Sequence, residues 1–427
     1  MSLVGKPGYK ETTVGWIPGE WTCEKLSDFV ALLTGAPFKS EFFSSDDGIP
    51  LIRIRDLLRG FSETGYIGDY DDRYLVNAGD VLVGMDGEFH VVRWKGAQAV
   101  LNQRVLKISE RPGRSDESFL FFLVANAIGK IQDGISATTV KHLSTKDLQN
   151  LIVAIPPLHE QQKIAAVLTA VDDKLDVIAR QIEATETLKR GLMQMLFSQG
   201  MGMPDADGRW VPHVGFKDSE LGRIPASWEV RPIGSLFDVV ERAVKMDETQ
   251  PYRRVTVKRR FGGIELRDEL PGAAIKVKNQ FLVEAGDFLI SERQIVHGAC
   301  GVVPSALTGA LVSNEYLVLR AKSETDVRYF NYMVQLLRFR KYFLLCSQGV
   351  DIEKFLFKPK DWLKKLVPVP PSEEQARIAD VLALVDQKLQ ALEEKQSECQ
   401  TLKRGLMQKL LSGEWCVKLE DAEPLAA

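Results

Sequence analysis

Two stretches of the chain carry the same long pattern of apolar positions. Residues 156–200 begin PPLHEQQKIAAVLTAVDDKL, and residues 370–413 begin PPSEEQARIADVLALVDQKL. They align without a gap at an offset of 214 positions, since 370 − 156 = 214. Their apolar residues recur at alternating steps of four and three, which is typical of the heptad seam of a coiled coil. We therefore predict two long helices that pair with each other as an antiparallel coiled coil.

Each helix has its own set of pairing positions. Paired prolines precede both helices, as suits a first helical turn, and Ser372 with Gln375 fits a capping box in the second. At about 1.5 Å per residue, about 40 residues span roughly 60 Å. The predicted pairing residues are Ile164, Leu168, Val171, Leu175, Ile178 and Ile182 in the first helix, and Ile378, Leu382, Val385, Leu389 and Leu392 in the second.

The duplication extends beyond the helices. GYKETTVGWIPGEW at 8–21 matches GFKDSELGRIPASW at 215–228, and YLVNAGDVLV at 74–83 matches FLVEAGDFLI at 281–290, both at an offset of 207 (215 − 8). A period of this length indicates a duplicated module rather than a solenoid. The predicted layout is a globular domain at 1–155, a helix at 156–200, a linker at 201–214, a second domain at 215–369, a helix at 370–413 and a tail at 414–427.

The globular regions have short β-type runs. We predict strands at 48–57, 75–84 and 99–108 and a helix at 118–131, then strands at 253–258, 281–291 and 311–319 and a helix at 327–345. The fold class is therefore mixed α/β (α+β), with twisted, mainly antiparallel sheets. The two copies agree at their ends and diverge in their interiors, as expected of two readers of different targets or of neutral drift.

Composition narrows the class of protein. The chain has 427 residues, of which 45% are hydrophobic and 26% charged, as is ordinary for a soluble protein of two or three domains. No apolar run has the length of a membrane span, and the N-terminus lacks a signal-peptide pattern. The five cysteines are scattered without a C-x-x-C pair, which indicates a reducing cytoplasm and no structural zinc.

We find no catalytic constellation in the sequence. GAPFKS at 35–40 is unlike a true phosphate-binding loop, because Phe38 stands where that loop has a glycine before its lysine. The Pro-Pro pairs lack the Asn or Asp before them and the aromatic residue after them that a DNA methyltransferase box needs. The five histidines show no metal-ligand spacing. We expect no catalytic residue, metal or cofactor in this chain.

Basic and amide side chains are more informative. The net charge is −3, but acidic residues gather in the helices and basic residues in the globular regions. Any one such residue alone is typical of a solvated surface, whereas five basic residues within 253–260 favour DNA, whose phosphates and base edges they can contact. The candidate DNA-binding residues are Lys39, Ser40, Arg53, Arg55, Arg93, Gln103, Arg104, Thr139, Lys141, His142, Arg253, Arg254, Lys258, Arg259, Arg260, Arg293, Gln294, Asn314, Gln348 and Lys354.

These features together resemble the specificity subunit of type I restriction-modification systems. The resemblance lies in IPPLHEQQKIA and VPPSEEQARIA, each followed by LKRGLMQ, and in GAPFKS, GIPLIRIRDL and KDLQNLIVAIPP. It covers nearly the whole chain. It implies that each globular region is a target recognition domain for one half of a bipartite DNA site, and that the helices fix the spacer between the halves.

The resemblance also implies partners. Two methyltransferase subunits would bring S-adenosylmethionine and flip the target adenine, and restriction subunits with ATP and magnesium would join them. An internal duplication agrees with two equivalent docking faces for two identical partners. The alternatives are a coiled-coil scaffold without sequence preference and an enzyme with divergent motifs. The target sequence itself cannot be deduced from these residues.

Overall fold

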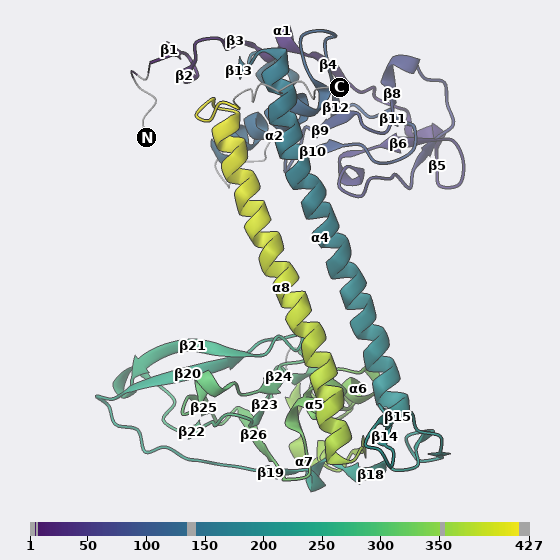
Figure 1. Ribbon diagram of the computed structural model, residues 1–427, viewed down its shortest axis with the longest axis vertical. Helices are drawn as coiled ribbons and strands as arrows, with labels where there is room; N and C mark the ends of the chain where they lie inside the picture. The colour runs from purple at the N-terminus through teal and green to yellow at the C-terminus, as the bar shows by residue number, and fades with distance from the viewer. Residues whose placement is uncertain (1–4, 6, 135–141, 351–354, 418–427) are drawn as a thin grey trace. The chain divides into compact units, whose positions relative to one another are not determined.

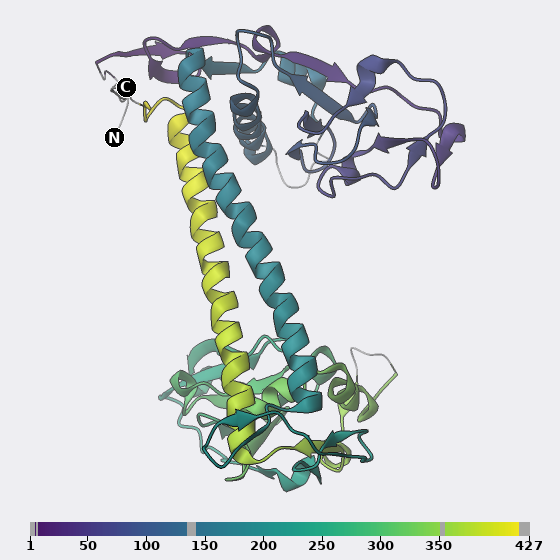
Figure 2. The ribbon, with the colours of Figure 1, turned by 45° about the vertical axis from the view of Figure 1, so that its right-hand side comes forward.

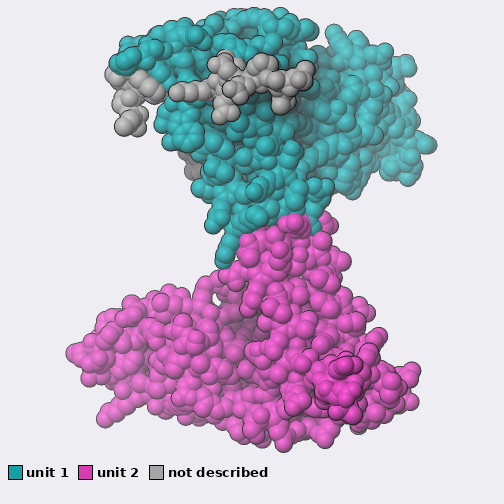
Figure 3. All heavy atoms as spheres, viewed as in Figure 1, with its two compact units in different colours: residues 1–180, 394–427 teal, residues 181–393 magenta. Residues whose placement is uncertain are grey.

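The computed structural model describes residues 5, 7–134, 142–350 and 355–417. The chain forms two compact units, one of residues 1–180 with 394–427 and the other of residues 181–393 (Figure 3). Unit 1 contains the first globular region, and unit 2 contains the linker and the second globular region. Each unit also takes the first half of one long helix and the last half of the other.

The long helices are α4 (Leu158–Gln199) and α8 (Ser372–Leu410). Within each unit their segments lie side by side in opposite directions (Figures 1 and 2), as predicted. Lys403 pairs with Asp172 at 2.6 Å in unit 1, and Lys189 pairs with Asp386 at 2.6 Å in unit 2. These are the same ion pair in the two copies, since 403 − 189 and 386 − 172 both equal 214.

The first turns of each helix also belong to the core of a globular domain. Ile164 and Leu168 are fully buried in unit 1, in one cluster with Leu410 from the end of α8. Their counterparts Ile378 and Leu382 are fully buried in unit 2, with Leu196 from the end of α4. Of the predicted pairing positions farther along, Ile178 and Leu392 are buried and the others are half-buried.

Unit 1 has two main sheets. Their strand orders are β10-β9-β12-β4 and β5-β7-β6-β11-β8, and all pairs are antiparallel except β6 with β11. The strands are β1 (Tyr9–Thr12), β2 (Gly15–Pro18), β3 (Thr22–Lys25), β4 (Ala31–Thr34), β5 (Phe43–Ser44), β6 (Ile49–Ile52), β7 (Gly65–Tyr66), β8 (Leu75–Val76), β9 (Val81–Gly84), β10 (Val91–Arg93), β11 (Ala99–Leu101), β12 (Val105–Ser109) and β13 (Ile152–Ile155), with helices α1 (Leu26–Phe29), α2 (Glu117–Gly134) and α3 (Thr145–Gln149).

Unit 2 repeats this plan. Its sheets are ordered β24-β23-β26-β19 and β21-β20-β25-β22, with one parallel pair, β20 with β25. The strands are β14 (Met203–Pro204), β15 (Trp210–Val211), β16 (Phe216–Lys217), β17 (Ile224–Pro225), β18 (Glu229–Pro232), β19 (Phe237–Val239), β20 (Pro251–Val257), β21 (Ile264–Pro271), β22 (Gln280–Leu282), β23 (Phe288–Ser291), β24 (Cys300–Val302), β25 (Leu311–Ser313), β26 (Tyr316–Ala321), β27 (Ser347–Gln348), β28 (Leu356–Phe357) and β29 (Leu366–Val369), with helices α5 (Val327–Met333), α6 (Leu337–Leu345) and α7 (Pro359–Trp362).

Several predicted elements are split in the structure. The run 75–84 is two strands, β8 and β9, and the run 281–291 is likewise β22 and β23. The AGD motif makes the turn between them, because Asp80 accepts the Asn77 N–H at 2.7 Å and Asp287 accepts the Glu284 N–H at 2.8 Å. Both aspartates also hold a basic side chain, Lys107 at 2.6 Å and Arg242 at 2.8 Å respectively.

Other predicted boundaries also change. The run 48–57 is a strand only from Ile49 to Ile52, and a 3-10 turn follows from Ile54. The runs 99–108 and 311–319 each contain two strands around a loop. The helix predicted at 327–345 breaks between α5 and α6, and the linker contains the β14–β15 hairpin. The predicted capping box of α8 is wrong, since the Gln375 side chain bonds to Asp326, Glu324 and Pro370 instead of Ser372.

The Glu-Gln pair of each Pro-Pro-x-x-Glu-Gln motif joins its helix to the domain. Glu160 accepts the indole N–H of Trp21 at 2.8 Å, and Glu374 accepts that of Trp228 at 2.8 Å. Both tryptophans are fully buried. Gln161, beside Glu160, receives the Asp116 N–H at 3.0 Å and donates to two backbone carbonyls. We call each carboxylate–indole contact a Glu–Trp lock.

The two Glu–Trp locks differ in how many donors they satisfy. Oε1 of Glu374 also accepts the backbone N–H groups of Met201 at 2.8 Å and Gly202 at 3.2 Å, and lies 2.9 Å from Nε2 of His213. The linker therefore docks on this carboxylate. Oε1 of Glu160 is buried and has no hydrogen-bond partner among the described residues.

We predict that Glu374→Ala destabilises its unit more than Glu160→Ala destabilises the other. The first substitution leaves several buried donors unpaired and costs about 3–5 kcal/mol, whereas the second orphans the Trp21 indole and costs about 1–3 kcal/mol. Urea unfolding of each variant, followed by tryptophan fluorescence, measures the two losses. Equal losses would contradict the unequal donor sets.

Candidate nucleic-acid interface

Equivalent loops lie at the same edge of the first sheet in each unit. Gly84 at the end of β9 pairs with Val105 at the start of β12, and Ser291 pairs with Tyr316 in the same way. The loop after β9 therefore lies beside the β11–β12 loop, and the loop after β23 lies beside the β25–β26 loop. Five of the twenty sequence-predicted candidates come from these loops: Gln103, Arg104, Arg293, Gln294 and Asn314.

In unit 1 a carboxylate holds two of the candidates together. Asp86, in the loop after β9, lies 3.0 Å from Nη1 of Arg104 and 2.5 Å from Nδ1 of His142. Gln103, exposed beside Arg104, is fixed through its backbone N–H, which donates to the Ala36 carbonyl at 3.0 Å. The structure thus brings three predicted residues to one surface.

In unit 2 the equivalent loops carry the opposite arrangement of charge. Arg293, in the loop after β23, pairs with Glu315 of the β25–β26 loop at 2.6 Å. The basic residue is here on the first loop and the acidic residue on the second, the reverse of Asp86 and Arg104. The same scaffold therefore presents different hydrogen-bonding groups in the two units.

Other candidates of unit 1 are distributed differently. Lys39 is exposed, 3.8 Å from Glu41, and Ser40 opens a short 3-10 turn. Arg55 is exposed beside Asp56 at 3.8 Å. Arg53 donates to Thr64 and lies over the Phe43 ring, and Arg93 lies over the Phe121 ring at 4.6 Å and donates to the Ser118 carbonyl. Arg93 thus packs against α2. Thr139 and Lys141 lie outside the described residues.

The basic residues Arg253, Arg254 and Lys258 are bound by groups of their own unit. Arg253 donates to the carbonyls of Ala306 at 2.9 Å and Thr308 at 2.8 Å. Arg254 forms a bidentate pair with Asp268 at 2.8 and 2.7 Å, and these hydrogen bonds hold the pKa of Asp268 below its usual value. Lys258 pairs with Glu265 at 2.5 Å. The β20–β21 hairpin therefore neutralises much of its own charge.

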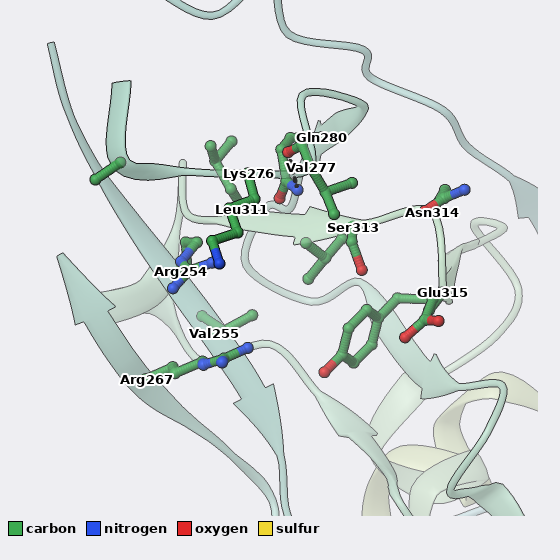
Figure 4. Close-up of a pocket in the computed structure, with 13 residues that line it drawn as sticks. Arg254, Val255, Arg267, Lys276, Val277, Gln280, Leu311, Ser313, Asn314 and Glu315 are labelled. Carbon is green, nitrogen blue, oxygen red and sulfur yellow. Dashed lines mark hydrogen bonds between the residues drawn. The ribbon is translucent and has the colours of Figure 1, made fainter. Parts of the chain in front are cut away.

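A cavity of about 470 Å³ lies beside this hairpin (Figure 4). Arg254 and Arg267 line it from β20 and β21, and Lys276 and Asn314 line it from the neighbouring segments. Arg254 and Asn314 are predicted candidates among them, whereas Arg267 and Lys276 were missed. The signal missed for Arg267 was the pairing of β20 with β21, which brings the second strand's side chains to the same surface.

Two further candidates of unit 2, Gln294 and Gln348, lie in or beside the loop after β23, because β28, the partner of β27, bonds to Glu292 of that loop. Gln294 has a buried side-chain oxygen without a hydrogen-bond partner among the described residues, and Gln348 accepts a hydrogen bond from Lys358. Burial raises the pKa of Glu292, and the charge of Glu315 raises it further. This loop therefore combines amide, basic and weakly acidic groups. Lys354 lies outside the described residues.

The described residues carry neither of two other kinds of site. None of their helices combines the length and the apolar composition needed to span a bilayer. No group of three or more His, Cys, Asp or Glu side chains among them is arranged to hold a metal ion.

Comparison with known proteins matches this architecture to proteins of one kind. The Type I restriction enzyme EcoBI specificity subunit of Escherichia coli is 36% identical over 181 residues, which are 42% of this chain and 37% of that protein. The Type I restriction enzyme MjaVIII specificity subunit of Methanocaldococcus jannaschii is 24% identical over 98% of both chains.

Solved structures agree at the level of the fold. The crystal structure of the type I restriction-modification S subunit from M. genitalium superposes with a TM-score of 0.56 at 16% identity, over 92% of this chain and 96% of that one. A chain from a study of complex assembly and conformational transition of the type I restriction-modification system gives a TM-score of 0.51 at 17% identity, over 93% and 99%.

The family model gives the assignment. The model of the type I restriction modification DNA specificity domain matches residues 18–187 and again residues 225–400, which together exceed half of the chain. The two matches coincide with the two copies of the duplication, each with most of its helix. The chain therefore belongs to the family of type I restriction-modification DNA specificity proteins.

Proposed function

We propose that this chain is the DNA-recognition subunit of a type I restriction-modification complex, with each globular domain reading one half of a bipartite site. The observation that carries the proposal is one scaffold built twice with different groups on equivalent loops. Asp86 and Arg104 on one copy correspond to Arg293 and Glu315 on the other. Base edges are distinguished by their donors and acceptors, so these loops suit two different half-sites.

In this proposal the chain recognises DNA and does not catalyse a reaction. Methyl transfer belongs to methyltransferase subunits that carry S-adenosylmethionine, and cleavage belongs to restriction subunits that use ATP and magnesium. The methyltransferase would reach the target base by flipping it out of the duplex. The specificity chain supplies the position on the duplex at which these activities work.

The helix pair sets the number of base pairs between the two half-sites. A paired helix is stiff, whereas a flexible linker fixes no distance. The equivalent ion pairs Lys403–Asp172 and Lys189–Asp386 support this role, because each fixes the register of the two helices within its unit. A spacer of one length follows from helices that cannot slide.

The two helices also offer equivalent surfaces for two copies of one partner. Residues 187–194 and 401–408 both read TLKRGLMQ, whereas 176–186 and 390–400 have no identical position. Within this block, Leu188 is 55% exposed and Leu402 is 54% exposed, and Arg190 and Arg404 are exposed as well. Packing within the chain does not require these exposed residues. Binding of the same methyltransferase subunit to each copy explains why they are identical.

The test of the proposed function is a map of methylated adenines. The chain is co-expressed with its cognate methyltransferase subunit, and the genome is read by single-molecule sequencing. We expect a bipartite motif with one spacer length. An intact complex that methylates no defined motif would favour the non-specific scaffold instead.

The same map tests the spacer. Inserting four residues into α4 after Gln194 should lengthen the spacer if the helices set it. Such an insertion, near the end of α4, would also displace Leu196 in the core of unit 2. We therefore choose positions after Arg180 in α4 and after Glu393 in α8, and insert four helical residues at both. The added rise of about 6 Å should lengthen the spacer by about one to two base pairs of 3.4 Å. Four residues inserted after Asp207, in the linker, should leave it unchanged. An unchanged spacer with extended helices would reject this role.

We predict that Leu188→Glu and Leu402→Glu each remove one bound methyltransferase subunit, because a charge then replaces an exposed apolar contact. The double variant should bind none. The mass of the purified complex, from light scattering or native mass spectrometry, counts the subunits. Val177→Glu is the matched control, since Val177 is 42% exposed and its counterpart is Ala391. Two subunits on the double variant would contradict docking at this surface.

A further inference from the structure

The β20–β21 hairpin turns through an unusual backbone conformation. Arg260 has a φ of 59° and Phe261 a φ of 57°, and they are the non-glycine residues with positive φ among the described residues. The Gly262 N–H donates to the Arg259 carbonyl at 3.2 Å, so the two residues occupy the centre of a tight turn. Turns with two left-handed central residues normally use Asn and Gly there.

A neighbouring loop holds this turn in place. The Arg260 N–H donates to the His297 carbonyl at 2.7 Å, and the Phe261 N–H donates to the Gly298 carbonyl at 2.8 Å. The Phe261 ring packs on Gly298, where a Cβ would come within 2.9 Å of the ring. Arg340 of α6 covers the same ring at 5.8 Å. The unfavourable backbone therefore persists because its surroundings determine it, which is characteristic of functional positions.

The side chain of Arg260 is placed differently from those of three other basic residues on the hairpin. The side chains of Arg253, Arg254 and Lys258 are held by carbonyls or carboxylates of unit 2. Arg260 is exposed at the tip of the turn, while its backbone is fixed. The loop that fixes it also carries Gln294, whose side-chain oxygen has no hydrogen-bond partner among the described residues.

A fixed backbone matters for one kind of DNA contact more than another. A phosphate can be neutralised by any flexible cation within reach, whereas a guanine edge requires the two donors of a guanidinium in one orientation. Nothing is gained by forcing arginine into left-handed backbone if only its charge is used. The conformation therefore favours a base contact.

We propose that Arg260 reads a guanine in the half-site bound by unit 2, with the strained turn as the device that aims it. This inference rests on the proposed function and adds the residue and the base. Recognition would be bidentate, from the guanidinium to O6 and N7 of guanine in the major groove.

Two substitutions of Arg260 separate the orientation of its guanidinium from its positive charge. Arg260→Lys keeps the charge but loses the bidentate fork, and Arg260→Asn suits the left-handed backbone but loses the cation. Both are co-expressed with the methyltransferase subunit, and methylated sites are mapped. We expect discrimination at one guanine in one half-site to fall by about 5- to 150-fold, with the other half-site unchanged. The midpoint of thermal unfolding should be unchanged for Lys and unchanged or higher for Asn.

Leu266→Ala is the control on the same hairpin. Leu266 is 49% exposed on β21 and is not among the candidate DNA-binding residues, so the variant should keep the complete motif. Loss of the same guanine in this control would overturn the proposal, because distortion of the hairpin would then explain the effect. An unchanged motif in both Arg260 variants, or an equal loss of methylation at all sites in the Asn variant, would also overturn it. A wild-type protein without a bipartite motif would reject the proposed function itself.

Discussion

The buried contact between a carboxylate and an indole is the constraint on which the rest of the molecule depends. A buried carboxylate is costly unless its oxygens accept hydrogen bonds. Glu160 meets this need at one oxygen with Trp21, and Glu374 meets it at both oxygens with Trp228 and the linker. The tryptophans come from the start of the globular domains. Each long helix is thereby joined at its first turn to the domain that precedes it. Together with the buried apolar residues of the first turns, this contact ties the position of a reading loop to that of the helix.

The loops proposed to read DNA differ between the two units, whereas the sheets and helices that hold them are repeated. The frame repeats the same order of four strands in each main sheet, with β5 added in unit 1. The loops between the strands reverse the charges of a single ion pair. The net charge of −3 is compatible with this, because many basic side chains are matched by carboxylates beside them. Recognition then depends on which few groups face outward rather than on the total charge.

The sequence allowed the frame to be predicted because its signals are local and repeated. A heptad seam, a Pro-Pro pair before the helix and two copies of the same motif are sufficient to predict α4 and α8. The divisions within 75–84 and 281–291 were missed because the turn depends on side chains of Asp80 and Asp287 that fold back on their own backbone. The ion pair between Arg254 and Asp268 was missed because the register of the β20–β21 hairpin places the two residues opposite each other. Register between strands is a tertiary property that periodicity does not contain.

The strained turn also bears on the order in which unit 2 folds. A hairpin whose central residues prefer left-handed backbone can nucleate at its turn, but Arg260 and Phe261 oppose that step. The compensating bonds come from His297 and Gly298, in the loop that joins β23 to β24. The β20–β21 turn is therefore stable only with the β23–β24 loop beside it. We expect the longest hairpin of the second domain to close its turn together with that loop and not ahead of it.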